Sequence, residues 1–195
     1  MKHEITSLNT KKSLAEALKR AVLKKPFSKI TVSEIINSCG VNRKTFYYHF
    51  EDIYALLKWT LEQEAIEVVK QFDLIVEYEE AFMFVMDYIE QNDAFLRNIC
   101  CSVGRDELKQ FFWNDFIEIM RSLINRTEKL ENLSVSDDFK MFLSQFYTEA
   151  IAGMLVDWIL YPSVRDKEKI MQYIFIIIHS AIPNSLHSAD SFNIK

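Results

Sequence analysis

Residues 31–50 read TVSEIINSCGVNRKTFYYHF and decide the fold of the whole chain. Thr31 is followed three residues later by Glu34, a capping box in which each side chain accepts a hydrogen bond from a free backbone N–H at a helix start. A helix is therefore expected from about Val32. Gly40 is expected to end it, because glycine readily adopts the left-handed conformation that closes a helix.

A second short helix is expected directly after this glycine. Asn42 is a favourable N-cap, and Phe46 and Phe50, four residues apart, share one face. Two short helices joined by a glycine-containing turn are typical of a helix-turn-helix, which presents its second helix to the major groove of DNA. The stretch therefore indicates DNA binding. Ile36 departs from the usual spacing, because a small residue commonly stands four positions before the turn glycine, and it predicts a wider helix crossing.

The distribution of charge agrees with this interpretation. Residues 1–60 contain eleven Lys and Arg against five Asp and Glu, a net charge of +6, although the whole chain has a net charge of −5. The remaining residues therefore carry −11. Affinity for phosphate is concentrated at the N-terminal end of an otherwise acidic protein.

The longer stretch ITVSEIINSCGVNRKTFYYHFED resembles the N-terminal DNA-binding domain of the TetR family of bacterial transcriptional regulators, in its Thr-Val opening, turn glycine and Tyr-x-His-Phe ending. This resemblance implies phosphate contacts from Thr31, Tyr47 and His49, groove contacts from Asn42, Arg43, Lys44, Thr45 and Tyr48, and core positions for Phe46 and Phe50. Ile53 stands where the family often has a phosphate-binding lysine. That contact is either missing or made by Lys44 or Lys58.

The residues themselves leave some of these roles open. Arg43 and Lys44 can read guanine in the major groove, or they can do no more than neutralise phosphate. We favour a base contact from at least one of Arg43, Lys44, Thr45 and Tyr48. Tyr47 and His49 are either phosphate ligands or half-buried packing residues, and the family pattern favours phosphate.

Composition indicates an all-α protein. The chain has 195 residues, 49% of them hydrophobic, with three Gly and three Pro, too few turn residues for a protein built of strands and hairpins. We expect an N-terminal three-helix DNA-binding domain over residues 1–52 and a larger helical regulatory and dimerisation domain over 53–195. The sequence has no stretch apolar enough to span a bilayer and no export signal, so a cytoplasmic location is expected.

Hydrophobic periodicity and helix-ending residues place the remaining elements. Helices are expected over residues 10–23, 53–72, 81–91, 94–101, 107–126, 136–161 and 167–181. Residues 127–138 are expected to form a loop, with Ser136 as the next N-cap. Pro162 and Pro183 are expected to end the last two helices, and residues 185–195 to form a frayed tail.

The last two long helices are expected to form a homodimer interface of the four-helix-bundle type. The segment IFIIIH in the second of them is apolar nearly all round, which requires burial on most of its surface. Ala150, Ala152 and Gly153 would permit close approach, and the bulk would come from Leu155, Trp158, Ile159 and Tyr173. The segment FYTEAIAGMLVDWI also resembles the late helix of TetR-type regulators of the Firmicutes type. His179 is expected to be a hydrogen-bonded interface residue.

The many aromatic residues after residue 60 suggest either an effector cavity or an ordinary core. The amphipathic and polar candidates for an effector site are Tyr88, Arg97, Asn98, Trp113, Asn114 and Tyr147. Cys100 and Cys101 have no nearby ligand at metal-binding spacing, so packing is favoured over a metal or redox sensor. No metal, cofactor or catalytic constellation is indicated, and the protein is not expected to be an enzyme.

Together these features predict a homodimeric transcriptional regulator that binds double-stranded DNA. We expect a repressor on a palindromic operator, released by a small apolar or aromatic effector. The alternative is a regulator or helical module whose C-terminal domain binds a partner protein instead of a small ligand. The acidic surface of the C-terminal part motivates that alternative.

Overall fold

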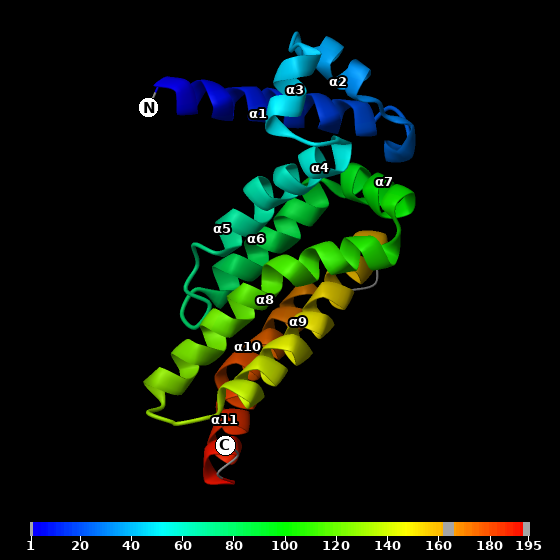
Figure 1. The fold of residues 1–195 in the computed structure, drawn as a ribbon. Helices are drawn as coiled ribbons and strands as arrows, with labels where there is room; N and C mark the ends of the chain where they lie inside the picture. The colour runs from blue at the N-terminus through cyan, green and yellow to red at the C-terminus, as the bar shows by residue number, and fades with distance from the viewer. Residues whose placement is uncertain (1, 162–165, 193–195) are drawn as a thin grey trace.

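The computed structural model describes residues 2–161 and 166–192, and these contain helices and loops without any strand (Figure 1). The first part of the chain contains α1 (Lys2–Val22), the 3₁₀ turn η1 (Phe27–Lys29), α2 (Val32–Cys39), α3 (Arg43–His49), α4 (Ile53–Leu61), the π-helical turn η2 (Glu62–Ile66) and α5 (Glu67–Val69). The second part contains α6 (Tyr78–Gln91), α7 (Asp93–Val103), α8 (Arg105–Leu130), α9 (Asp137–Leu160), α10 (Lys167–Ile176), the π-helical turn η4 (Ile177–Ala181) and α11 (Ile182–Ser191). The all-α prediction is confirmed.

The segment from α1 to α3, residues 2–52, is called the head below, and residues 53–192 are called the body. In the head, the predicted capping box is present: the Thr31 side chain accepts from the Glu34 N–H while the Glu34 carboxylate accepts from the Thr31 N–H. Gly40 has φ +69°, the left-handed conformation that ends α2. The fully buried Leu14, Leu18 and Phe46 form the centre of the head's core.

The first helix is longer than predicted, because it begins at Lys2 and not near Thr10. The hydroxyl of Thr10 donates to the Thr6 carbonyl one turn earlier, so it acts within the helix and not as its cap. Since neither glycine nor proline occurs in residues 2–9, nothing in the sequence interrupts the helix there.

Asp52 caps the connecting helix by accepting a hydrogen bond of 2.8 Å from the Ala55 N–H. This helix ends at Val69, before the predicted Phe72. The N–H groups of Gln71 and Phe72 each bond a carbonyl three residues back, which tightens and closes the last turn.

In the body, α8 and α9 lie side by side and make the most extensive contact between helices (Figure 1). Helices α6, α7 and α8 each begin slightly earlier than predicted. The loop predicted over residues 127–138 is shorter than expected and covers residues 131–136, because α8 continues to Leu130 and α9 begins at Asp137. Thr127 is buried there and donates to the Leu123 carbonyl. Ser136 caps α9 as predicted, and α9 ends at Leu160.

The prediction for the C-terminus is also wrong. Pro183 does not end a helix: α10, η4 and α11 follow one another without a break from residue 167 to 191, and Leu186 and Ala189 of the predicted tail are buried. A proline inside a helix cannot donate to the carbonyl four residues back and clashes with it. The π-helical turn directly before Pro183 widens the helix at that point. The predicted role of Pro162 lies outside the described residues.

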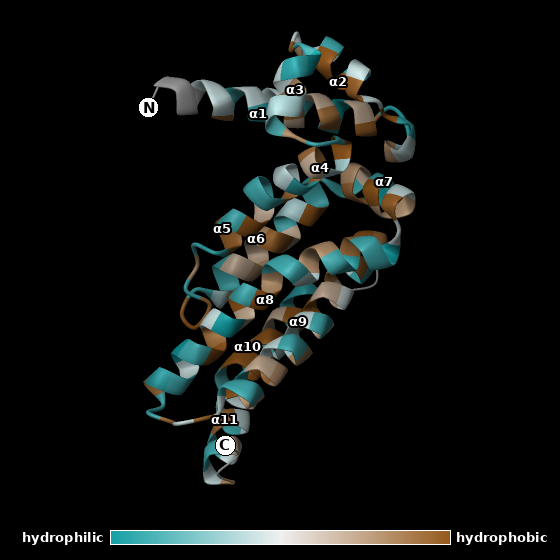
Figure 2. Cartoon of the chain, in the orientation of Figure 1, coloured by the Kyte–Doolittle hydropathy of each residue, from teal (hydrophilic) through white to brown (hydrophobic). Residues whose placement is uncertain are grey.

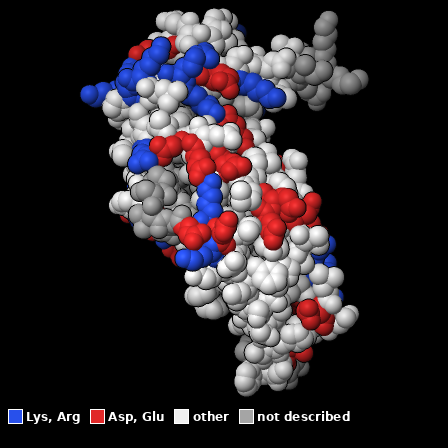
Figure 3. Space-filling view, turned by 180° about the vertical axis from the view of Figure 1, so that it is seen from behind, with Lys and Arg blue, Asp and Glu red and all other residues white. Residues whose placement is uncertain are grey.

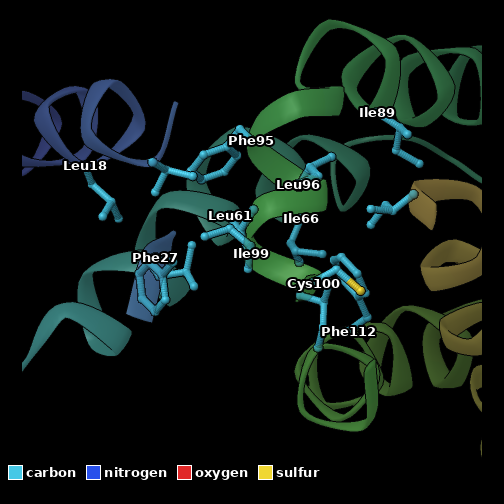
Figure 4. Close-up of a cluster of buried hydrophobic side chains, with 14 of the residues drawn as sticks. Leu18, Phe27, Leu61, Ile66, Ile89, Phe95, Leu96, Ile99, Cys100 and Phe112 are labelled. Atoms are coloured by element: carbon cyan, nitrogen blue, oxygen red, sulfur yellow. The ribbon is translucent and has the colours of Figure 1, made fainter. Parts of the chain in front are cut away.

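A continuous hydrophobic core joins the head to the body through α7. Figure 4 shows α7, which carries Phe95, Leu96 and Ile99, between Leu18 and Phe27 on one side and body residues on the other. Phe27 and Ile30, which lie between α1 and α2 in the sequence, are buried in this core. Among the described residues, no helix is long and apolar enough to cross a membrane.

Candidate nucleic-acid interface and effector cavity

Helix α3 presents a basic and aromatic face to solvent. Arg43 and Lys44 are exposed, and Tyr47 and Tyr48 expose 49% and 76% of their surface. The opposite face is anchored by Phe46, whose ring is fully buried. The guanidinium of Arg43 lies 5.9 Å from the centre of the Tyr47 ring, so the two side chains stand together on the surface.

Near the start of α2, Glu34 contacts both Thr31 and Lys25. Glu34 accepts hydrogen bonds from the backbone and hydroxyl of Thr31, at 2.8 and 2.9 Å, and forms an ion pair with Lys25. The bond from Lys25, followed by those from Thr31, lowers the pKa of Glu34 to about 2. The Thr31 side chain is exposed but already hydrogen-bonded within the head.

Asn42 and Thr45 shape the first turn of α3. The Asn42 side-chain oxygen accepts from the Thr45 N–H at 2.8 Å and from the Thr45 hydroxyl at 3.0 Å. Asn42 is exposed and Thr45 is half-buried. Their mutual bonds fix the start of α3. The bonds use the Asn42 oxygen, so the amide nitrogen of this exposed residue can donate to a phosphate or a base edge.

A lysine that the sequence analysis did not single out lies beside the end of α3. The Lys11 ammonium is 5.8 Å from the centre of the Phe50 ring and 5.6 Å from that of Trp59. Burial, and then the charge of Lys11, lowers the pKa of His49, which is half-buried. The sequence could have indicated this position of Lys11. Lys11 precedes the buried Leu14 by three residues, and residues three apart lie on the same side of a helix.

Ile53 is half-buried at the start of α4, where a lysine could have reached phosphate. Lys58 lies 3.6 Å from Glu62 on its own helix, whereas Lys44 is exposed on α3. Figure 3 shows Lys and Arg side chains gathered on the head and Asp and Glu side chains prominent on the body.

The body contains a cavity of about 690 Å³ between α6, α8, α9 and α10. Its wall is mainly aliphatic and aromatic, and includes Phe82, Val85, Phe116, Met120, Ile151, Leu155, Trp158, Ile174 and Ile178. Among the described residues, the charged side chains in this wall are Asp166 and Lys169, which lie 3.4 Å from each other. A charged ligand would lose hydration there without a free counter-ion, so the cavity suits an uncharged, mainly apolar molecule.

Two family descriptions match this sequence. Residues 14–58 match the bacterial regulatory proteins of the tetR family, and residues 77–180 match a transcriptional regulator C-terminal region. The second match alone spans more than half of the chain. The chain belongs to the TetR family of transcriptional regulators.

Individual relatives agree with this assignment. The HTH-type dhaKLM operon transcriptional activator DhaS of Lactococcus lactis subsp. lactis (strain IL1403) is 24% identical over 148 residues, which are 76% of this chain and 78% of that protein. A solved structure of the dihydroxyacetone kinase operon activator DhaS has a TM-score of 0.68 at 23% identity, covering 89% of this chain and 96% of that one. Native NalD, the secondary repressor of the MexAB-OprM multidrug efflux pump in Pseudomonas aeruginosa, has a TM-score of 0.52 at 16% identity with the same coverage. The two solved structures support the fold.

The effector-site candidates of this TetR-family regulator do not come together in one place. Tyr147 lines the large cavity, and burial raises the pKa of its phenol. Tyr88 lies outside that cavity and donates a hydrogen bond of 3.0 Å to Glu64. Arg97 pairs with Asp93 on its own helix.

The other three candidates also lie elsewhere. Asn98 bonds the backbone of the head, and Asn114 accepts from Gln110 on the surface of α8. Trp113 is half-buried and packs against the main core. The sequence did not indicate the residues that line the cavity, because aliphatic residues such as Ile119 and Ile174 occur equally in an ordinary hydrophobic core.

The last helices of this TetR-family protein expose an apolar surface, although some of the predicted interface residues are in the core. Leu155, Trp158, Ile159 and Ala152 are buried within the chain itself. The exposed apolar side chains are instead Met141, Phe142, Phe146 and Met154 on α9 and Tyr173, Phe175, Ile176 and Ile177 on α10 and η4. Figure 2 shows hydrophobic residues along α10. The segment IFIIIH, residues 174–179, was expected to be buried, but within one chain its side chains are half-buried or exposed.

The structure also places the cysteines and His179, which the sequence analysis considered as possible ligand or interface residues. Cys100 is buried, which raises the pKa of its thiol, while Cys101 is exposed. His179 packs its ring 5.4 Å from that of Tyr78 and 4.6 Å from that of Phe175. Within the described part of the chain, no cluster of three His, Cys, Asp or Glu could hold a metal ion.

Proposed function

We propose that this TetR-family regulator is a homodimeric repressor that binds a palindromic operator and releases it when a small apolar or aromatic molecule enters the body. The observation that carries this proposal is the exposed basic face of α3 on a capped helix-turn-helix, at the basic end of an otherwise acidic chain. DNA affinity concentrated at one end is the arrangement expected of a molecule that reads DNA with paired heads.

Within each head, we assign two kinds of contact. Arg43, Lys44 and Tyr48 are exposed on α3 and are the side chains best placed for base edges, with Asn42 and Thr45 at the first turn. Phosphate contacts are assigned to Thr31, Tyr47 and His49, and we add Lys11, whose ammonium lies beside the end of α3. The division between the DNA-binding and regulatory domains is placed at Asp52, the cap of the connecting helix.

Dimerisation is supported by the apolar surface of α9 and α10. Phe146 and Ile176 expose 59% and 55% of their surface to solvent in the isolated chain. Large apolar side chains exposed in this number on neighbouring parts of the body favour a protein–protein interface, and a second copy offers the same side chains in return. Two heads related by a two-fold axis would meet successive major grooves, about 34–36 Å apart, and so require a palindromic site.

An effector in the body is supported by the size and wall of the cavity. A volume of about 690 Å³ falls within the range of ligand pockets, roughly 300–1,000 Å³. Helix α6 lines the cavity and also carries Tyr88, which bonds the connecting helix at Glu64. A ligand that prefers one position of α6 would therefore shift the population of head positions. This cavity favours a small molecule over a partner protein as the regulating ligand.

Repression is the simplest action of such a dimer, because it requires only occupancy of the operator. The relatives act in both directions, since DhaS is named an activator and NalD a repressor. A transcriptional reporter joined to the DNA upstream of the protein's own gene decides the sign. Deletion of the regulator raises expression if it represses and lowers expression if it activates.

Native mass spectrometry of the protein purified from its host tests the rest of the proposal. We expect a dimer carrying a small apolar adduct, lost when the cavity is filled by Ile119→Trp. The matched control is Ile117→Trp on the same helix, since Ile117 does not line the cavity. A co-purifying protein in place of the adduct would favour the alternative of a protein partner.

A further inference from the structure

Asn98 of α7 holds the end of the head's first helix. Its amide nitrogen donates to the Val22 carbonyl at 2.8 Å and to the Lys25 carbonyl at 3.1 Å, while its oxygen accepts from the Phe27 N–H at 3.0 Å. These three bonds join residues more than 70 positions apart in the sequence. One body side chain thus contacts three backbone groups of the head.

The sequence around the end of α1 explains why an outside donor is needed. Val22 is the last residue of α1, and the residue four positions later, which would normally donate to its carbonyl, is Pro26. Proline has no N–H, so the Val22 carbonyl has no donor from its own helix. The Asn98 amide supplies that donor and satisfies a carbonyl that the head cannot satisfy by itself.

Ser102, one turn further along α7, completes the same contact. Its hydroxyl lies 3.1 Å from the Phe27 nitrogen and donates to the Asn98 oxygen at 3.2 Å. Residues four apart on a helix share a face, so both side chains point at the head together. The bond from Ser102 fixes the orientation of the Asn98 amide, with its oxygen toward Phe27 and its nitrogen toward the carbonyls.

A second polar contact holds the head at another point. Lys19 of α1 pairs with Glu64 at 2.8 Å, and the same carboxylate accepts from the Tyr88 hydroxyl of α6 at 3.0 Å. Glu64 lies in η2, the π-helical turn of the connecting helix. Glu64 and Asn98 are therefore two separate polar attachments of the head, in addition to the apolar core, and two such points limit rotation of the head more than one.

We propose that Asn98 is the positioning residue that fixes the angle of the head on the body, and that it thereby sets the half-site spacing that the dimer accepts. This role rests on the proposed function, because spacing has meaning only for a dimer that reads two half-sites. Directional polar contacts suit this task better than the surrounding apolar core, because hydrogen bonds weaken steeply when their angle changes.

Operators with altered spacing test this role. Gel shifts are run on duplexes that carry the palindrome from the gene's own upstream DNA, with the gap between half-sites changed by one and two base pairs, and on a duplex with a single half-site. The wild-type dimer is expected to prefer one spacing roughly 100-fold over a two-base-pair change, because a misplaced head loses the gain of bivalent binding. Asn98→Ala is expected to reduce this preference below about tenfold and to leave single half-site affinity within about twofold.

The matched control is Asn114→Ala, which removes an asparagine from the surface of α8 and should keep the wild-type preference. Thermal unfolding verifies that each variant is folded, and Ser102→Ala, expected to weaken the preference in the same direction, replaces Asn98→Ala if that variant is unfolded. A folded variant that retains the full preference at the same spacing overturns the role of Asn98. A wild-type protein that binds no palindrome, or shows no preferred spacing, overturns the proposed function and this role with it.

Discussion

At the scale of single residues, the helix-turn-helix is held in place by short polar side chains at helix starts. Thr31, Asn42 and Asp52 each accept a bond from the backbone N–H three residues further on, so each helix begins at a defined residue. Such caps stabilise a helix by about 0.5–2 kcal/mol each. They matter here because α2 and α3 are too short to be stable alone.

Glu34 is expected to make the stability of the protein depend on pH. Its pKa is lowered to about 2 by Lys25 and Thr31, so its contribution is fully present above the ordinary value of 4.5 and is lost as the pH falls toward 2. Glu34→Gln removes the charge and should lower the unfolding temperature most above pH 4.5, with the difference from wild type shrinking below it. Thermal melts across this range measure the difference. A difference that stays constant with pH would show that the Glu34 charge has no part in stability.

At the scale of elements, the two π-helical turns have different roles in the packing of the helices. The turn at 62–66 lies in the connecting helix and carries Glu64, which bonds α1 and α6. The turn at 177–181 ends two residues before Pro183, and the helix continues past the proline. As a result α11 reaches α8 and closes a second hydrophobic cluster with Leu123, Ile124 and Leu143.

Substitution of Leu186 tests whether α11 packs against the rest of the body. Its side chain is fully buried, and Leu186→Ala should destabilise the protein by about 2–5 kcal/mol through lost burial and the cavity left behind. Phe192→Ala is the control, since Phe192 is 78% exposed, and should change stability by less than about 0.5 kcal/mol. Urea unfolding measures both. Equal, small effects would mean that residues 185–192 do not pack in solution.

The sequence allowed the helix-turn-helix over residues 31–50 to be predicted almost residue by residue, because its signals are local, whereas the start of α1 was missed. The caps at Thr31 and Asn42 and the turn at Gly40 depend on residues at most four apart, and all three were confirmed. The end of the chain could not be predicted in this way. Whether Pro183 ends a helix depends on a π-helical turn and on the distant α8, against which Leu186 packs.

The binding residues divide along the same line. Of the candidates on α3, Arg43, Lys44, Tyr47 and Tyr48 are exposed together, because their spacing along one helix places them there, whereas Thr45 and His49 are half-buried. Asn98 was predicted as an effector ligand, yet it contacts the head, because its partners lie over 70 residues away and no local pattern records them. The cavity wall comes from α6, α8, α9 and α10, so it depends on tertiary packing.

At the scale of the whole molecule, the exposed apolar surface on α9 and α10 lies far along the chain from the basic head. A dimer formed through that surface would leave both heads free for DNA, as Figure 1 shows for the separate places of α3 and α10. The acidic body would reduce its own affinity for DNA and leave binding to the heads.

A charge placed in this surface should separate the dimer. Phe146→Glu and Ile176→Glu each introduce a carboxylate into the proposed interface, at a cost on the order of 3 kcal/mol, so the dimer dissociation constant should rise about 100-fold. Val76→Glu is the control, because Val76 is equally apolar and 69% exposed but lies in the loop before α6. Sedimentation equilibrium gives the constants. A dimer unaffected by both interface variants would place the contact elsewhere.

The most direct test of DNA reading by α3 is a gel shift on the protein's own upstream DNA, with Arg43→Ala and Tyr47→Ala compared with wild type. Arg121→Ala, on the surface of α8 beside Glu118, is the control for a lost positive charge. We expect wild type and Arg121→Ala to bind alike, and each α3 variant to lose about 1–3 kcal/mol, roughly 5- to 150-fold in affinity. Unchanged affinity in both Arg43→Ala and Tyr47→Ala would contradict DNA reading by this helix.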